Sequence, residues 1–102
     1  MVNALIIDDD PSIRTTMRSI LEYANIDVDE AEDGEIGLRK LKKNTYDVVL
    51  LDIHMPKMDG LQVMSALKKR KQSIPVIVVS ANLSNEILEK LNQLGVKEFL
   101  SK

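Results

Sequence analysis

The chain has 102 residues, of which 44% are hydrophobic and 29% charged, with a formal net charge of −2. This composition is typical of one soluble globular domain, and so small a charge gives no general attraction to nucleic acid or anionic membrane. Cysteine is absent, which excludes a disulfide framework, a thiol nucleophile and a thiolate metal site. Because no apolar segment is long enough to cross a bilayer and no signal peptide opens the chain, we expect a cytoplasmic protein with no membrane partner.

Short apolar runs alternate with segments of helical periodicity, which predicts successive βα units around a parallel sheet. Five strands are expected, at about 2–7, 26–29, 47–51, 75–79 and 97–101. Four helices are expected between them, the first from residue 11, the second reaching about 43, the third around 61–67 and the fourth ending at Gly95. Asp10, Asp33 and Ser84 stand where they can cap the first, second and fourth helices.

The apolar pattern also predicts which surfaces are buried. In the first helix the residues expected to face the sheet are Ile13, Met17, Ile20 and Leu21. The strands at 47–51 and 75–79 are apolar almost throughout, which predicts burial on both faces in the middle of the sheet. The strands at 26–29 and 97–101 are mixed and are expected at the rims. This arrangement fits an α/β fold with a flavodoxin-like, doubly wound, five-stranded parallel sheet in the order 2-1-3-4-5.

Chemically reactive residues follow four of the five predicted strands. Asp8 and Asp9 follow the first strand, Asp52 the third, Ser80 the fourth and Lys102 the fifth. Because ligands bind beyond the carboxyl ends of the strands in open α/β sheets, we expect these side chains to form one site. Oxygen ligands without His or Cys beside them favour Mg²⁺ or Mn²⁺. A carboxylate nucleophile, a metal, a lysine and a hydroxyl together predict phosphoryl transfer.

Four segments also form a recognisable pattern, which consists of LIIDDD at 5–10, VVLLDIHMPKMDG at 48–60, VVSA at 78–81 and FLSK at 99–102. In this order they closely resemble the receiver domains of two-component response regulators. The resemblance implies that Asp52 is the phosphoacceptor. It also implies that Asp8 and Asp9 are the acidic pair that binds the metal, with Asp9 the closer ligand, and that the backbone carbonyl of His54 completes the metal's protein ligands.

The same resemblance assigns roles to the later strands. Ser80 would be the switch hydroxyl and Lys102 the phosphate-binding lysine. Phe99 stands where the family has a rotating aromatic residue, although simple core packing is an equally good interpretation. His54 and Asn82 are expected near the phosphoryl group, where they would tune the lifetime of the phosphate. The implied partners are a histidine kinase or phosphotransfer protein and a downstream effector or output domain.

The chain departs from this family at its end. Receiver domains normally continue past the lysine with a proline and a fifth helix, whereas this chain stops at Lys102. The resemblance therefore implies a C-terminally short receiver domain over 1–102, with four helices and the fifth missing. We expect an apolar patch where that helix would pack. The alternatives are a tail absent from this sequence, a shortened chain, or a partner chain that covers the patch in a homodimer.

Three functions remain as alternatives, of which the first is a phosphorylation-dependent switch rather than an enzyme. The second is an unphosphorylated receiver-like scaffold, against which the complete set of reactive residues argues. The third is a phosphatase of the haloacid-dehalogenase type, because Asp8 and Asp10 match the spacing of that family's nucleophile motif. The basic runs at 42–43 and 68–71 fall near helix ends, where cations suit the helix dipole, so no direct nucleic-acid contact is expected.

Overall fold

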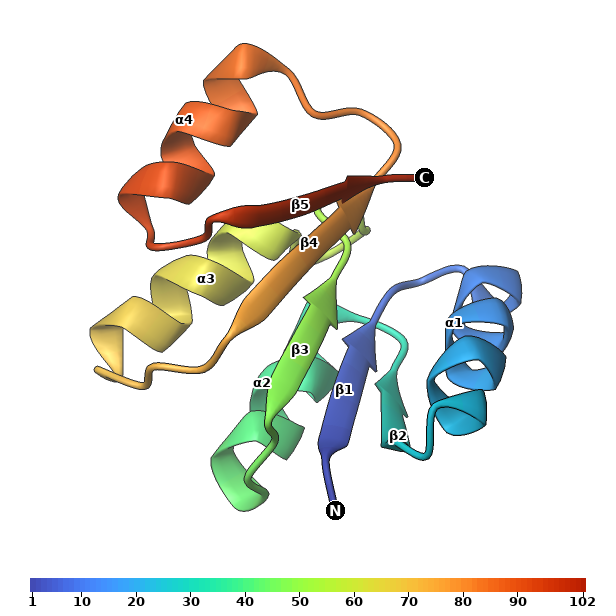
Figure 1. Cartoon of the computed structure of the whole chain (residues 1–102). Coiled ribbons are helices and arrows are strands. Elements are labelled where there is room, and N and C mark those ends of the chain that lie inside the picture. Colours follow the sequence, from blue (N-terminus) through green and yellow to red (C-terminus); the bar gives the residue numbers. More distant parts are fainter.

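Five parallel strands form one sheet in the order β2-β1-β3-β4-β5 in the computed structural model, which describes residues 1–102 (Figure 1). The elements along the chain are β1 (Asn3–Ile7), α1 (Pro11–Tyr23), β2 (Asp27–Ala31), α2 (Gly34–Lys43), β3 (Val48–Leu51), α3 (Gly60–Lys69), β4 (Val76–Ser80), α4 (Asn85–Gln93) and β5 (Glu98–Ser101). The predicted fold class, strand order and number of helices are confirmed. No helix in the structure combines the length and apolar character needed to span a bilayer.

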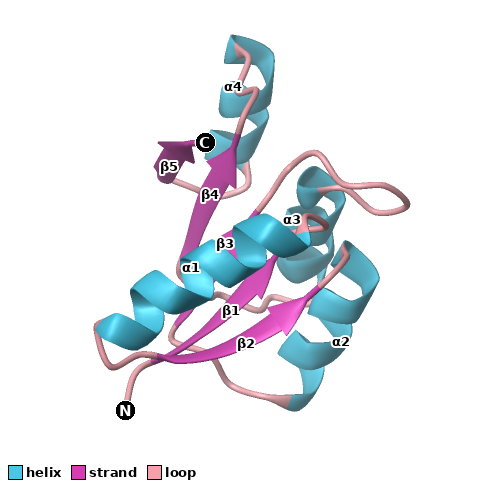
Figure 2. Ribbon diagram, turned by 90° about the vertical axis from the view of Figure 1, so that its right-hand side faces the viewer, coloured by secondary structure: helices cyan, strands magenta, loops and turns pink.

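The helices lie on both sides of the sheet. Helix α1 packs against β1 and β2 on one side of the sheet (Figures 1 and 2). Helix α2 packs against the same strands on the other side, where α3 lies next to α2 and α4 lies next to α3. The main core lies between the sheet and α2, α3 and α4, and its fully buried members include Leu5, Ile7, Leu51, Val63, Val78 and Leu91. The sheet is thus well covered on one side and only partly covered on the other.

This uneven cover corrects two predictions. Helix α1 has no buried residue, and Ile20, which was expected to face the sheet, is 64% exposed. The alternate residues of the central strands that face the α1 side, such as Leu50 and Ile77, are half-buried rather than buried. The reason is that α1 contacts only β1 and β2, so no helix lies over β3, β4 and β5 on this side.

Side-chain hydrogen bonds cap the N-termini of three helices at the residues predicted from the sequence. The side chain of Asp10 accepts a hydrogen bond from the Ser12 amide, and Asp33 and Ser84 cap α2 and α4 in the same way. Helix α3 begins with a capping box that was not predicted from the sequence. The amide of Gln62 donates to the Asp59 side chain, and the Asp59 amide donates to the Gln62 side chain, each at 2.9 Å.

Strand β2 ends later than predicted, at Ala31 rather than at residue 29, because pairing with β1 continues to the end of that strand. Ile6 is the partner of Glu30, and Ile7 is the partner of Ala31. The alternation of apolar and acidic residues stops before the pairing does. Other strand bounds differ from the predicted ones by about one residue, as is usual where strands fray into loops.

Candidate functional site

Three carboxylates meet at the carboxyl edge of the sheet. Ligand oxygens of Asp8, Asp9 and Asp52 all lie within 4.8 Å of one another. Strand pairing explains the cluster, since Ile7 and Leu51 are partners at the ends of β1 and β3. The Asp52 amide then donates to the Ile7 carbonyl at 2.9 Å and continues the ladder by one more residue. The parallel register therefore holds two acids side by side just beyond the last strand pair.

These acids differ in their exposure to water. Asp8 is fully buried and Asp52 is 4% exposed, whereas Asp9 is exposed. Asp8 Oδ1 accepts a hydrogen bond from the Asp10 amide at 2.9 Å. Asp8 Oδ2 pairs with the Lys102 ammonium, whose Nζ lies 2.9 Å away. Lys102 Nζ also lies 3.4 Å from Asp52 Oδ2, so one lysine forms ion pairs with two buried acids.

The charge balance at this point shifts two pKa values. Burial raises the pKa of Asp52, and the neighbouring charge of Asp8 raises it further, although Lys102 opposes both effects. Burial alone would lower the pKa of Lys102, but its contacts with Asp8 and Asp52 outweigh burial and raise that pKa. Three carboxylates beside one ammonium leave an excess of negative charge. Such a group favours a cation or a proton, because like charges at short range disfavour full ionisation.

Ser80 lies at the end of β4, next to the strand that carries Asp52. Its side chain is fully buried, and Ser80 Oγ has no hydrogen-bond partner. A buried hydroxyl without a partner costs about 1–3 kcal/mol, so its presence calls for an explanation. The Ser80 carbonyl accepts from the Lys102 amide at 3.1 Å. This backbone bond fixes the position from which the Lys102 side chain reaches Asp8 and Asp52.

Phe99 lies on β5 opposite Val78 and is half-buried, and it packs against the edge of the main core. The ring is therefore neither locked in the core nor free in solvent. Its position on the strand beside β4 places it near the strand that carries Ser80. Core packing and a mobile aromatic ring, the two interpretations made from the sequence, stay predictions for this residue.

His54 connects two loops at the edge of the site. Its amide donates a long hydrogen bond of 3.4 Å to Asp52 Oδ1. Its imidazole Nε2 lies 2.8 Å from the carbonyl oxygen of Asn82, so the proton of this hydrogen bond is on Nε2. The imidazole thus bridges the loop after β3 and the loop after β4. Asn82 takes part through its backbone rather than through its side chain, which the sequence could not indicate.

A second group of charged residues supports the loop after β1. Arg14 Nη1 donates to the Asp8 carbonyl at 2.7 Å, and Arg14 Nε lies 3.0 Å from Glu30 Oε1. Arg18 Nε contacts the other Glu30 oxygen at 2.6 Å and holds the pKa of Glu30 below its usual range. This network was not predicted from the sequence. The spacing of Arg14 and Arg18, four residues apart on one helix face, was the available signal.

Gly60 allows helix α3 to begin directly against the loop that follows Asp52. A Cβ atom at this position would lie 2.5 Å from the Asp52 carbonyl oxygen and 2.9 Å from the Ile53 Cα. The Gly60 amide donates to the Ile53 carbonyl at 3.0 Å. Only glycine permits this close approach, so the start of α3 holds the backbone of the acidic site in place.

Comparison with known proteins identifies the family of this chain. The family model described as the response regulator receiver domain matches residues 4–102. The chain belongs to this family. Receiver domains are the phosphorylation-dependent switches of two-component signal transduction, and this receiver domain is homologous to those of response regulators.

Two curated relatives illustrate the match. The gliding motility regulatory protein of Myxococcus xanthus is 35% identical over 103 residues, which cover 99% of this chain and 13% of that protein. The alkaline phosphatase synthesis transcriptional regulatory protein PhoP of Bacillus subtilis is 33% identical over 100 residues, which cover 96% of this chain and 41% of that protein. This receiver domain therefore spans less than half the length of either relative.

Solved structures agree on the fold. Chemotaxis protein CheY4 of Vibrio cholerae has a TM-score of 0.93 and 30% identity, with 100% of this chain and 87% of that chain covered. Response regulator TrrA of Thermotoga maritima, solved in complex with Mg²⁺-BeF, has a TM-score of 0.87 and 32% identity, again with 100% and 87% covered. The receiver domain thus has the CheY-like fold of these proteins.

Substitution of Asp52 by Asn tests the charge balance of the site. A carboxyl whose pKa is raised on folding stabilises the folded state while it is protonated, and this stabilisation is lost as pH rises through the folded pKa. In EDTA, we therefore expect D52N to be more stable than wild type by on the order of 1 kcal/mol at about pH 7, with a smaller difference at about pH 4. Urea unfolding at the two pH values measures this, and the exposed D27N variant is the control. An equal difference at both pH values would contradict the prediction.

Proposed function

We propose that this receiver domain, over residues 1–102, accepts a phosphoryl group on Asp52 from a histidine kinase or phosphotransfer protein and acts as a switch rather than as an enzyme. The observation that carries the proposal is the cluster of Asp8, Asp9 and Asp52, whose ligand oxygens lie within 4.8 Å of one another beside the Lys102 ammonium. Of the three acids, Asp52 follows the central strand β3 and contacts both Lys102 and the His54 amide.

The residues present fit a divalent metal ion. Asp8, Asp9, Asp52 and the His54 carbonyl offer only oxygen ligands, which suit Mg²⁺ and also Mn²⁺. Three carboxylates and one ammonium leave two negative charges unbalanced, which a divalent ion would neutralise. The TrrA complex with Mg²⁺-BeF supports Mg²⁺ in this role. When bound, the ion would supply positive charge to the phosphoryl oxygens during transfer.

The protein side chains account for the remaining steps of transfer. An oxygen of the Asp52 carboxylate attacks the phosphorus of a phosphohistidine, and the phosphorus–nitrogen bond breaks as the donor imidazole leaves with its electron pair. Lys102 neutralises one phosphoryl oxygen, because its ammonium already lies 3.4 Å from Asp52 Oδ2. The product is an acyl phosphate on Asp52.

The unpartnered hydroxyl of Ser80 supports a switch mechanism. Ser80 Oγ is buried with no hydrogen bond, and a phosphoryl oxygen on the neighbouring strand would be the acceptor that it lacks. Movement of Ser80 toward Asp52 would vacate space for Phe99, which is half-buried on β5. The turn of that ring would change the surface of α4 and β5, which a downstream effector or output domain would read.

His54 and Asn82 would set the lifetime of the acyl phosphate. The 2.8 Å contact between His54 Nε2 and the Asn82 carbonyl closes one side of the site. A water molecule that hydrolyses the acyl phosphate must approach past the loops that this contact joins. The bridge would therefore slow dephosphorylation.

The apolar surface on the α1 side of the sheet supports the proposal that a second copy of the chain covers it. Ile20 is 64% exposed and Leu100 is 56% exposed there, and a symmetric dimer would remove both from water in both copies. We further propose that the protein works in the cytoplasm without direct contact to nucleic acid, since its net charge is −2 and its composition lacks basic excess.

Phosphorylation of Asp52 is tested by intact mass spectrometry after incubation with Mg²⁺ and acetyl phosphate. Wild type should gain the mass of one phosphoryl group, and D52N should gain none because its amide is not nucleophilic. The D10N variant should be phosphorylated like wild type, since Asp10 caps α1 and lies outside the carboxylate cluster. Phosphorylation of D52N, or its loss in D10N, would contradict the assignment and favour a nucleophile at Asp8.

The role of the His54 bridge is tested by the decay of the phosphorylated protein. Loss of one hydrogen bond worth about 0.5–1.5 kcal/mol predicts that H54A loses phosphate roughly three- to tenfold faster than wild type. N82A retains the backbone carbonyl that accepts this bond, so its decay rate should stay close to that of wild type. Equal dephosphorylation rates for H54A and wild type would show that the His54 bridge does not affect the lifetime of the acyl phosphate.

The proposed dimer is tested by sedimentation velocity over a range of concentrations. Wild type should show a concentration-dependent increase in sedimentation coefficient, and the L100E variant should sediment as a monomer because a charge at the interface would have to be desolvated. E98K on the same strand, which is exposed, is a control for general surface changes. A wild type that remains monomeric at all concentrations would rule out self-association.

A further inference from the structure

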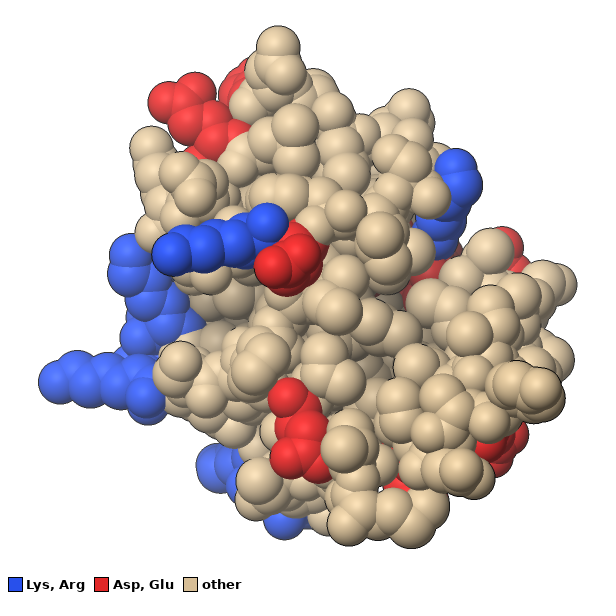
Figure 3. Space-filling view, in the orientation of Figure 1, with Lys and Arg blue, Asp and Glu red and all other residues tan.

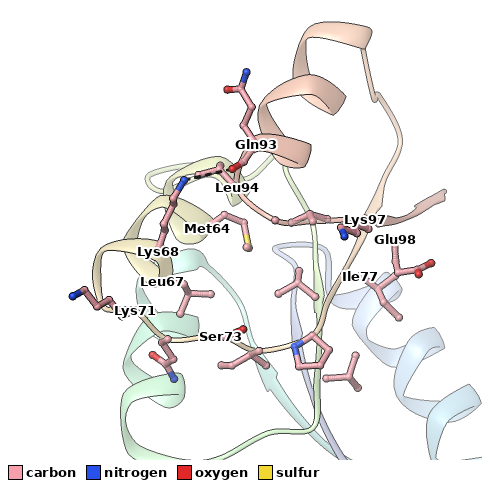
Figure 4. Close-up of a pocket in the computed structure, with 17 residues that line it drawn as sticks. Met64, Leu67, Lys68, Lys71, Ser73, Ile77, Gln93, Leu94, Lys97 and Glu98 are labelled. Atoms are coloured by element: carbon pink, nitrogen blue, oxygen red, sulfur yellow. Dashed lines mark hydrogen bonds between the residues drawn. The ribbon is translucent and has the colours of Figure 1, made fainter.

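A cavity of about 730 Å³ lies at the amino-terminal edge of the sheet, away from the carboxylate site. It is bounded by the last turn of α3, the segment that follows α4, and the first residues of β4 (Figure 4). Asp52 follows the last residue of β3, whereas the cavity is lined by Val48 at the first residue of that strand. The two sites therefore lie at opposite edges of the same sheet. No step in the proposed phosphoryl transfer uses this cavity.

Apolar side chains line part of the cavity. Eight of its 17 lining residues are hydrophobic, and these include Met64, Leu67, Val76, Leu94 and Val96. Met64 and Leu67 lie between the surrounding lysines in Figure 4. The volume is in the range of pockets that bury a compact ligand or a large side chain. None of the lining residues is aromatic, so no ring is present on which a nucleobase could stack.

The rim of the cavity is positively charged. Lys68, Lys71 and Lys97 line it, and Glu98 is the one acidic residue beside them, in a chain whose net charge is −2. Lys and Arg side chains gather over the ends of α3 and α4, at the left of the molecule in Figure 3. Lys68 Nζ reaches the Gln93 carbonyl at 3.5 Å. The lysines that form ion pairs are others, namely Lys40, Lys90 and Lys102, so the rim cations are not neutralised.

The backbone at Lys71, which carries one of these cations, has the left-handed conformation. Lys71 has φ of 55° and lies just past α3, where the Gln72 amide donates to the Leu67 carbonyl in a helix-terminating turn. Gly95 occupies the corresponding position after α4, with φ of 93°. A residue with a Cβ atom is strained in this conformation and glycine is not. The α3 end nevertheless carries lysine, whose side chain lines the cavity.

We propose that this lysine-rimmed cavity binds an acidic peptide segment of a partner protein. One large apolar side chain of the segment enters the hollow between α3 and α4, and carboxylates on either side of it meet Lys68, Lys71 and Lys97. Charge complementarity selects an acidic occupant, and the apolar part of the lining selects one that carries a hydrophobic anchor. Because the cations surround a concave, partly apolar hollow, the surface suits a peptide better than a flat anionic membrane.

Selection of random 12-residue peptides on the whole chain tests the proposal. Enriched peptides should carry an Asp or Glu cluster around one Leu, Ile, Met or Phe. Their affinity, measured by fluorescence anisotropy, should fall about tenfold or more in the K68E/K71E/K97E variant, since three favourable charge contacts become repulsive. The R39E/K42E/K43E variant has the same change in net charge on α2 and should bind nearly as wild type does. Raising the salt concentration should weaken binding to wild type.

Several outcomes would overturn the proposal. These are failure to enrich acidic peptides, equal binding to the two triple variants, or binding of phosphatidylserine vesicles that depends on the same three lysines. Phosphorylation by acetyl phosphate should proceed equally in K68E/K71E/K97E and wild type, because none of the three residues belongs to the carboxylate site. This measurement verifies that the variant is folded, and a folded variant that binds the peptides as wild type does would exclude the cavity as their site.

Discussion

The pairing of β1 with β3 is the constraint on which the rest of this structure depends. The parallel register holds Asp8 and Asp52 next to each other at the end of the ladder, and the surrounding core excludes water from both. Two buried acids in this position repel each other, and Lys102 offsets only part of the repulsion. The uncompensated charge supports the divalent cation that we propose for this site and the phosphoryl transfer that we propose for Asp52. A sheet with another strand order would separate the acids and remove this support.

The surrounding polypeptide keeps this unfavourable arrangement in place through backbone contacts. Arg14 donates to the carbonyl of Asp8 while Glu30 holds its guanidinium. The Lys102 amide bonds the Ser80 carbonyl, which ties the last strand to β4. Gly60 lets α3 begin against the Asp52 loop without a steric clash. Each of these contacts involves a main-chain atom near the site and none of the carboxylate oxygens of Asp8 or Asp52.

The two edges of the sheet have opposite chemical character. Acidic side chains gather at the carboxyl edge, and lysines gather at the amino-terminal edge around a partly apolar cavity. The α3 and α4 helices end at the second edge, where their terminal carbonyls are stabilised by nearby cations. The proposed phosphoryl transfer and the proposed peptide binding therefore involve separate groups of residues. Such a separation would let one domain receive a signal at one edge and bind a partner at the other.

The sequence alone determined the features that depend on neighbours along the chain. Asp10, Asp33 and Ser84 cap their helices as predicted, because a cap needs only the next two or three amides. The alternation of strands and helices predicted the fold class, and the contrast between apolar and mixed strands predicted a strand order that the structure confirms. That order brings the acids at the ends of β1 and β3 together. Apolar periodicity failed for Ile20, since a periodic face becomes buried only where a second element covers it.

Tertiary structure decided everything that joins distant segments through specific atoms. The bond from Arg14 to the Asp8 carbonyl, the bridge from His54 to the Asn82 carbonyl and the unpartnered hydroxyl of Ser80 follow from the packing of separate loops. A one-dimensional pattern specifies residue types and their local spacing, but main-chain carbonyls are identical at every position. Which carbonyl a side chain reaches is therefore set by the three-dimensional fold.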